Sequence, residues 1–355
     1  MKINHNFFSN LAFNIAEYNL GKTKKNPSVG CVVVKNNSVI SSGITSVNGR
    51  PHAEFNALKR KIDFRNSTLY VTLEPCTHYG ITPPCTNIIK KKKIKKVFYC
   101  FDDFDLRTKQ KAKKELIKNN INTKKVFFKN NNFYKSYFLN RKNGLPLIDA
   151  KIAISKDNFT INKKSKWISN YRSRKVAHLI RSKYDCILST SKSINKDNSL
   201  LNCRIEGFNY FKPELIIIDN HLSLKTDLKL ISLAKKRKTY IFTASNNKKK
   251  INFFKRKNIK VLKFDELLTK KDFNFFFKKI YSLGKTRILV ESGLTFLNKL
   301  LYYNLLNNLY IFKSNLNLKK KGSNNAKIDF IKNLKPNEKI NVNLQNDKLF
   351  KVRIK

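Results

Sequence analysis

With 355 residues, of which 41% are apolar, the chain is long enough for two packed domains. Its 75 lysines and arginines against 23 acidic residues give a formal net charge of +52. The basic residues are spread along the whole chain, together with abundant asparagine, isoleucine and phenylalanine. Compositional drift therefore explains the charge better than a surface that binds nucleic acid. No apolar run is long enough to span a membrane and no secretion signal precedes the first apolar helix pattern, so we expect a cytoplasmic protein without a membrane partner.

Strand-like and helix-like segments alternate over the first 144 residues. An amphipathic helix is predicted around Phe7 to Tyr18. Strands are predicted at Val29–Val34, Leu69–Leu73, Val97–Phe101 and Val126–Phe128. Helices are predicted at Ala53–Arg60, Thr86–Lys92, Lys109–Lys118 and Phe133–Leu139. This rhythm predicts a sheet covered by helices, and the glycine and proline of 144–146 indicate a linker, so we divide the chain into domains 1–144 and 145–355.

A second series of strands and helices follows the linker. Strands are predicted at Leu147–Ile154, Cys186–Leu188, Leu215–Asp219, Thr239–Thr243 and Ile288–Glu291, with helices near Arg172–Arg181 and Leu294–Leu301. No G-x-G-x-x-G segment occurs here. Gly293, between a strand and a helix, is as consistent with a phosphate cradle as with a simple turn. Lys151, inside a strand, is either a buried functional ammonium or an edge residue that faces water.

The first half carries the residues of a catalytic zinc site. His52 stands two positions before Glu54, and the strand Leu69–Leu73 leads into Cys76, with Cys85 further along. One imidazole and two thiolates leave the fourth tetrahedral position of zinc open to a water, whose pKa the metal lowers. Glu54 is then placed to move protons without binding the metal. The combination of H-x-E with P-C is typical of zinc-dependent deaminases.

The spacing of the two cysteines distinguishes deaminase subclasses. Residues 77–84 separate Cys76 from Cys85, whereas nucleoside and RNA-editing deaminases have two residues there. The run LEPCTHYGITPPC at 73–85 and the run NPSVG at 26–30 resemble the bifunctional deaminase–reductase family of riboflavin biosynthesis. The resemblance implies hydrolytic deamination of 2,5-diamino-6-ribosylamino-4(3H)-pyrimidinone 5′-phosphate, with Asn26 as a substrate contact. Ile81 and Thr45 stand where the family usually has arginine and often has histidine.

The second half resembles the reductase part of the same family at residues 144–157, 167–169, 197–204 and 290–293. The resemblance implies a domain similar to dihydrofolate reductase, which uses NADPH to reduce the ribosyl group to ribityl. Lys151 and Glu291 would be catalytic. Substrate contacts would be Ser165, Arg181, Leu201, Arg204 and Glu291. Cofactor contacts would be Ala153, Trp167, Ser169, Ser193, Asp197, Gly293, Leu294, Thr295, Phe296, Leu297, Asn298 and Lys299. Asn158, Asn198, Ser199 and Leu294 depart from the family pattern.

Two other functions were weighed against this one. The first is a zinc deaminase that acts on a base in tRNA or another nucleic acid through a basic C-terminal domain, and the second is a non-catalytic zinc-stabilised nucleic-acid binder. The cysteine spacing disfavours the first, and Glu54 disfavours the second. We therefore predict an α/β protein, a cytidine-deaminase-like α/β/α sandwich followed by a dihydrofolate-reductase-like α/β domain. Its cofactors would be zinc and NADPH, its substrate a small pyrimidine nucleotide, and its assembly a homo-oligomer.

Overall fold

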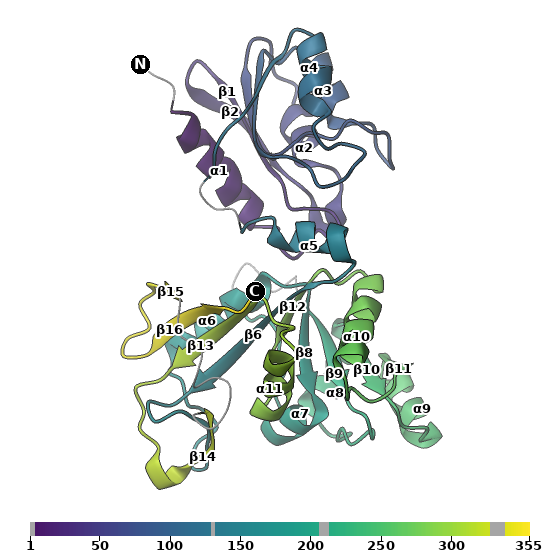
Figure 1. Cartoon of the computed structure of the whole chain (residues 1–355), viewed down its shortest axis with the longest axis vertical. Helices are drawn as coiled ribbons and strands as arrows, with labels where there is room; N and C mark the ends of the chain where they lie inside the picture. The colour runs from purple at the N-terminus through teal and green to yellow at the C-terminus, as the bar shows by residue number, and fades with distance from the viewer. Residues whose placement is uncertain (1–3, 129–131, 206–212, 327–337) are drawn as a thin grey trace. The chain divides into compact units, whose positions relative to one another are not determined.

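The computed structural model describes residues 4–128, 132–205, 213–326 and 338–355. The chain divides into two compact units, Met1–Gly144 and Leu145–Lys355, each with its own main sheet (Figure 1). Across the described ranges, no helix combines the length and apolarity that crossing a membrane requires.

The first unit is built on a five-stranded sheet with the order β2-β1-β3-β4-β5. The strands are β1 (Gly30–Lys35), β2 (Ser38–Ile44), β3 (Thr68–Leu73), β4 (Lys96–Phe101) and β5 (Asn122–Lys125). β1 pairs antiparallel with both β2 and β3, whereas β3, β4 and β5 run parallel. The hairpin strand β2 carries few apolar side chains, which is why its pattern was not recognised in the sequence.

Helices cover both faces of this sheet (Figure 1). They are α1 (His5–Glu17), α2 (Ala53–Leu58), α3 (Cys85–Lys91), α4 (Ala112–Lys118) and α5 (Lys135–Asn143), with a short 3-10 helix η1 (Val47–Gly49). Because side chains alternate along a strand, Cys31 and Val33 of β1 pack toward α2, and Val32 and Val34 pack toward α1. The unit is therefore a three-layered α/β/α sandwich.

The prediction of a strand at 126–128 is wrong, because the strand of this region lies just before it in the chain. β5 occupies Asn122–Lys125, and beyond it only the amide of Val126 continues the pairing, to Tyr99 O of β4. Phe128 instead stacks on Phe13 of α1, with ring centroids 3.7 Å apart. The apolar residues of this run therefore cover the core as a loop rather than as a strand, a choice that periodicity alone does not reveal.

The second unit is built on a nine-stranded sheet with the order β11-β10-β9-β8-β12-β6-β13-β16-β15. Its strands are β6 (Leu147–Ile154), β8 (Cys186–Thr190), β9 (Glu214–Ile218), β10 (Thr239–Thr243), β11 (Ile259–Lys263), β12 (Arg287–Val290), β13 (Asn308–Lys313), β15 (Glu338–Lys339) and β16 (Lys348–Arg353). The strands from β11 to β13 run parallel, and β16 and β15 add an antiparallel edge. β7 (Phe159–Asn162) and β14 (Gly322–Asn325) form a separate pair.

Helices cover both faces of the second sheet as well (Figure 1). They are α6 (Tyr171–Ser182), α7 (Ser191–Asp197), α8 (Lys229–Ser232), α9 (Lys248–Arg256), α10 (Lys270–Ser282) and α11 (Leu294–Tyr302), with the 3-10 helices η2 (Ala234–Lys236) and η3 (Lys319–Lys321). In β9, Ile216 belongs to the core under α10 and α11, whereas Ile217 belongs to the core under α8 and α9. This near-continuous apolar strand is typical of a parallel sheet buried on both faces.

Helix α10 offers a matched test of this core. Phe276 is fully buried and packs edge-on against Phe242, whereas its neighbour Phe275 is 65% exposed. We expect Phe276→Ala to lower the free energy of unfolding by about 3–5 kcal/mol, since a buried phenylalanine leaves a cavity. Phe275→Ala should cost a small fraction of that. Urea unfolding followed by circular dichroism measures both, and equal losses would contradict the burial of Phe276.

Candidate active sites

The first candidate site lies where α2, the end of β3 and α3 meet. His52 is the residue before α2, Cys76 follows β3, and Cys85 opens α3. The Sγ atoms of Cys76 and Cys85 lie 3.6 and 3.4 Å from His52 Nδ1, and the three donor atoms lie within 4.8 Å of one another. Sulfur and nitrogen ligands of one tetrahedral zinc lie about 3.5 Å apart, given the usual Zn–S and Zn–N lengths. The donor set and its spacing therefore fit a zinc ion.

The two sulfurs are unequal in charge. The backbone amide of Cys85 donates to Cys76 Sγ at 3.2 Å. The Cys85 side chain and His52 also stabilise the Cys76 thiolate, and they lower the pKa of Cys76 to about 4 against the opposing effect of burial. Contact with Cys76 and burial raise the pKa of Cys85. The pair thus shares one proton, and a divalent cation at this point would stabilise both sulfurs as thiolates.

Glu54 lies in the first turn of α2 and is 3% exposed. Burial raises its pKa to about 7, and the negative charge of Cys76 adds to this effect. A carboxyl group with a pKa near neutrality gives up and takes back a proton at little cost, which is what a general acid/base requires. The structure therefore places the predicted proton carrier beside the predicted ligands.

An open cleft with about 540 Å³ of empty space lies beside this cluster. Asn26, the predicted substrate contact, lines the cleft and donates from Nδ2 to Gly49 O at 2.9 Å. Three cations that the sequence motifs did not include also line this cleft, namely Arg50, Arg107 and Arg141. They lie outside the recognised motifs, and among so many basic residues the sequence held no signal that would have singled them out.

A buried carboxylate shapes part of this wall. Glu74, in the Glu-Pro-Cys turn, accepts hydrogen bonds from the backbone amides of Asp103, Gln110 and Ala112, at 2.9–3.1 Å. These bonds fix the segment that follows β4. Within it, Asp105 binds the Arg107 guanidinium at 2.6 Å, and Arg141 lies 3.4 Å from the same carboxylate oxygen. Glu74 therefore has a structural role that the motif by itself did not reveal.

The two departures from the family pattern differ in position. Thr45 is 1% exposed and lines the cleft, and its hydroxyl accepts from the amide of Val29 at 3.0 Å. Ile81 is 87% exposed and is not among the described residues that line the cleft. Thr45 thus replaces a ring that could reach the substrate with a side chain that holds the start of β1.

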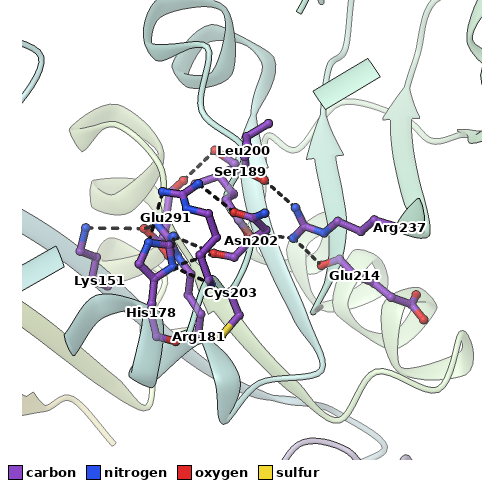
Figure 2. Close-up of polar contacts among 12 residues, drawn as sticks. Lys151, His178, Arg181, Ser189, Leu200, Asn202, Cys203, Glu214, Arg237 and Glu291 are labelled. Carbon is purple, nitrogen blue, oxygen red and sulfur yellow. Dashed lines mark hydrogen bonds and ion pairs between the residues drawn. The ribbon is translucent and has the colours of Figure 1, made fainter. Parts of the chain in front are cut away.

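The second candidate site lies beside the central strands of the larger sheet. β12 lies between β8 and β6, and the register pairs Val290 with Ala150 and with Leu188. The next residues, Glu291 and Lys151, are therefore neighbours. Figure 2 shows Lys151 and Arg181 converging on Glu291, with Lys151 Nζ 3.5 Å from Oε2 and Arg181 bound through Nε at 2.5 Å and Nη2 at 2.9 Å.

This cluster holds one anion and two cations away from water. Although burial opposes it, the charges of Arg181 and Lys151 lower the pKa of Glu291 to about 2, so the carboxylate stays ionised. Burial lowers the pKa of Lys151, an effect that Glu291 partly offsets. A buried ammonium with a lowered pKa is a better proton donor than a solvated lysine. Lys151 therefore lies on a central strand of the sheet and faces Glu291, with 19% of its side chain exposed, and it is not an edge residue that faces water.

Several of the predicted cofactor contacts gather next to this cluster. Ser193 of α7 accepts a hydrogen bond from the amide of Gly293 at 3.0 Å, so residues a hundred positions apart meet at the start of α11. Ser292 Oγ and Asn298 Oδ1 are buried without a hydrogen-bond partner among the described residues. Trp167 is 47% exposed, under the Arg174 guanidinium at 4.5 Å. Polar side-chain atoms without a partner and an exposed indole ring fit the polar and aromatic contacts that a dinucleotide such as NADPH would make.

Other predicted contacts point elsewhere. The side chains of Leu201, Leu294 and Leu297 are buried in the cores, so any contact with a ligand would come from their backbone. Arg181 is committed to Glu291 and to Asn202 O, whereas Arg204 is exposed. The remaining predicted contacts lie at the ends or surfaces of elements: Ala153 in β6, Ser165 and Ser169 before α6, Asp197 at the end of α7, and Thr295, Phe296 and Lys299 in α11.

Both halves match known protein families. Residues 2–101 match the cytidine and deoxycytidylate deaminase zinc-binding region, and residues 146–315 match the RibD C-terminal domain. The riboflavin biosynthesis protein RibD of Actinobacillus pleuropneumoniae is 31% identical over 290 residues, which cover 79% of this chain and 76% of that protein. The same protein of Aquifex aeolicus is 31% identical over 300 residues, 81% of this chain and 80% of its own length.

Solved structures match over nearly the whole chain. Acinetobacter baumannii RibD (form 2) superposes with a TM-score of 0.82 at 22% identity, covering 98% of both chains. The Thermotoga maritima diaminohydroxyphosphoribosylaminopyrimidine deaminase/5-amino-6-(5-phosphoribosylamino)uracil reductase superposes with a TM-score of 0.78 at 23% identity, again covering 98% of both. At these identities the likeness concerns the fold, and it confirms the predicted fold class.

The geometry of the first site makes a prediction about metal content. We expect Cys85→Ala to lose the stoichiometric zinc of the purified protein, because two ligands do not hold a catalytic zinc. Cys100→Ala is the matched control, since Cys100 is also a buried thiol of this unit but lies outside the cluster. Elemental analysis after gel filtration measures both variants. Full zinc in Cys85→Ala would remove Cys85 from the ligand set.

Proposed function

The chain belongs to the bifunctional deaminase–reductase family of riboflavin biosynthesis, and from this premise we propose which of its residues carry out each reaction. The enzyme deaminates 2,5-diamino-6-ribosylamino-4(3H)-pyrimidinone 5′-phosphate and then uses NADPH to reduce the ribosyl group of the product to ribityl. The observation that carries the proposal is the meeting of His52, Cys76 and Cys85 beside a buried Glu54.

We assign deamination to unit 1–144 and reduction to unit 145–355. Each family match lies within one of these units, and each unit contains one of the two charged clusters. Whether the protein is a homo-oligomer and where in the cell it works both stay predictions from the sequence.

In the deaminase unit, His52, Cys76 and Cys85 would hold the zinc, which supplies a Lewis acid and lowers the pKa of a water at its open position. Glu54 takes one proton from the attacking water and passes it to the ring nitrogen, then takes the second proton of that water and passes it to the departing amine, so that the amidine carbon becomes a carbonyl and ammonia leaves. Asn26 holds the pyrimidine edge. The three cleft arginines supply the positive charge that a phosphorylated substrate needs.

In the reductase unit, NADPH supplies two electrons and a hydrogen to the ribosyl carbon, and one further proton completes the reduction. Lys151 donates that proton to the sugar oxygen that is released when the ribose ring opens. Glu291 holds the Lys151 ammonium in place at 3.5 Å, and Arg181 keeps Glu291 ionised and oriented. Arg204, exposed beside this cluster, is the contact we assign to the substrate phosphate.

Glu54→Gln separates metal binding from proton transfer. The amide keeps the shape of the side chain but neither takes up nor releases a proton at neutral pH, so we expect stoichiometric zinc, unchanged NADPH-dependent reduction and a deamination rate lower by about 10²–10⁴-fold. Glu115→Gln, at a surface ion pair of the same unit, should change neither activity. Ammonia release from the diaminopyrimidine nucleotide is the measurement, and full activity of Glu54→Gln would exclude Glu54 as the proton carrier.

Lys151→Ala tests the second site. We expect NADPH oxidation with the deaminated nucleotide to fall by at least about 100-fold, the usual contribution of a general acid, while deamination continues. Lys156→Ala, an exposed lysine just after the same strand, is the control and should oxidise NADPH normally. If Lys151→Ala oxidised NADPH at the wild-type rate, another residue would have to supply the proton.

The tRNA alternative has its own test. Ammonia release is compared on the free nucleotide and on unmodified tRNA, at equal enzyme concentration. We expect turnover on the free nucleotide alone, and turnover on tRNA alone would overturn the assignment.

A further inference from the structure

We propose that His178 is a positioning residue of the reductase site: its neutral imidazole bridges Asn202 and Arg204 and so holds the Arg204 guanidinium where it meets the substrate phosphate. This inference rests on the phosphate-binding role proposed above for Arg204. His178 belongs to α6, and none of the sequence motifs included it.

The contacts of the ring define what Nε2 must offer to Arg204. His178 Nδ1 lies 2.9 Å from Asn202 O, and Nε2 lies 3.3 Å from Arg204 Nη2. A guanidinium only donates, so the contact with Arg204 Nη2 requires an unprotonated Nε2. At Nδ1, one acceptor, Asn202 O, lies beside two donors, Arg181 Nη1 at 3.2 Å and the backbone amide of Arg204 at 3.3 Å. A neutral imidazole with an unprotonated Nε2 accepts from Arg204, whereas a charged imidazolium would repel Arg204 across a hydrogen-bond distance.

The surroundings keep the ring neutral. His178 is 8% exposed, and Arg181 Nη1 lies 3.2 Å from its Nδ1. Burial first, and then the charges of Arg181 and Arg204, lower the pKa of His178 to about 4. The Asn202 carbonyl and the Glu291 carboxylate oppose this shift only in part. The acceptor for Arg204 is therefore present throughout the physiological pH range.

The two arginines of this cluster have different tasks. Arg181 is buried and uses its donors on Glu291 and on Asn202 O (Figure 2). Arg204 is exposed, and the two contacts that fix its guanidinium are His178 Nε2 and Asn202 Oδ1, at 3.3 and 3.0 Å. A flexible arginine that is held in this way loses less conformational freedom when an anion binds. Loss of the imidazole should therefore weaken binding of the phosphate specifically.

The backbone of this segment has a separate anchor. Arg237 donates to the carbonyl oxygens of Leu200, Leu201 and Pro213, at 2.6, 2.8 and 2.6 Å. Figure 2 shows Arg237 on the side of Asn202 away from His178. Because these bonds do not involve the imidazole, they should hold the path of residues 200–201 when the ring is removed, while the Arg204 side chain and the ring's own contacts with the backbone of Asn202 and Arg204 are released.

The experiment compares His178→Ala, His178→Gln, Arg204→Ala and the double variant His178→Ala/Arg204→Ala in NADPH oxidation, with the deaminated substrate and with its dephosphorylated form. We expect Arg204→Ala to raise KM for the phosphorylated substrate by about 10–100-fold, as for lost hydrogen bonds to a charged group, and His178→Ala to raise it by about tenfold with kcat within twofold. Glutamine should restore KM, because its amide also offers one donor and one acceptor. The double variant should be no worse than Arg204→Ala.

Each outcome decides one of the claims. If Arg204→Ala leaves KM unchanged, the proposed role of Arg204 fails and this inference fails with it. If Arg204→Ala raises KM but His178→Ala does not, only the inference fails. Equal losses on both substrates, a lower melting temperature of His178→Ala, or no rescue by His178→Gln would show a structural role and overturn the proposal. His221→Ala, an exposed histidine of the same unit, is the control and should match the wild type.

Discussion

One constraint governs the first unit, namely that three ligands from three separate segments must reach a single metal ion. The sheet meets this constraint by ending β3 just before Cys76, while α2 and α3 begin at its side with His52 and Cys85. Thiolates and a carboxylate in one buried place repel one another. A divalent cation relieves that repulsion, so the metal and the fold of these turns depend on one another.

In the second unit, two side-chain cations rather than a metal stabilise a buried negative charge. Glu291 is buried at the end of a central strand and would be costly there without partners. Arg181 binds it through two hydrogen bonds and Lys151 adds a second positive charge, so the carboxylate remains ionised and the ammonium becomes a better acid. Around this pair, His178 and the guanidinium of Arg237 hold the neighbouring segment through its carbonyl oxygens.

The similarity to the family and the local geometry agree, but the first concerns the reactions and the second concerns individual residues. The relatives define the two reactions, and the local geometry supports our proposal for the residues that this chain uses in each. Thr45 is a case in point, since the family often has histidine there and this chain uses the hydroxyl to hold β1. Beyond the arginines that line the first cleft and Lys151, Arg181 and Arg204 of the second site, we assign no part in either reaction to the large positive charge.

The sequence by itself determined the order of most strands and helices and the two reactions, and it predicted the three residues that meet as a zinc-binding cluster, because these depend on short motifs and on local periodicity. It did not determine which apolar runs become strands, as residues 126–128 show, nor that Leu201 and Leu297 are buried in a core. It also could not identify Arg50, Glu74, His178 or Arg237. Their roles come from hydrogen bonds and clefts between segments far apart in the chain, and only the packed tertiary structure brings those segments together.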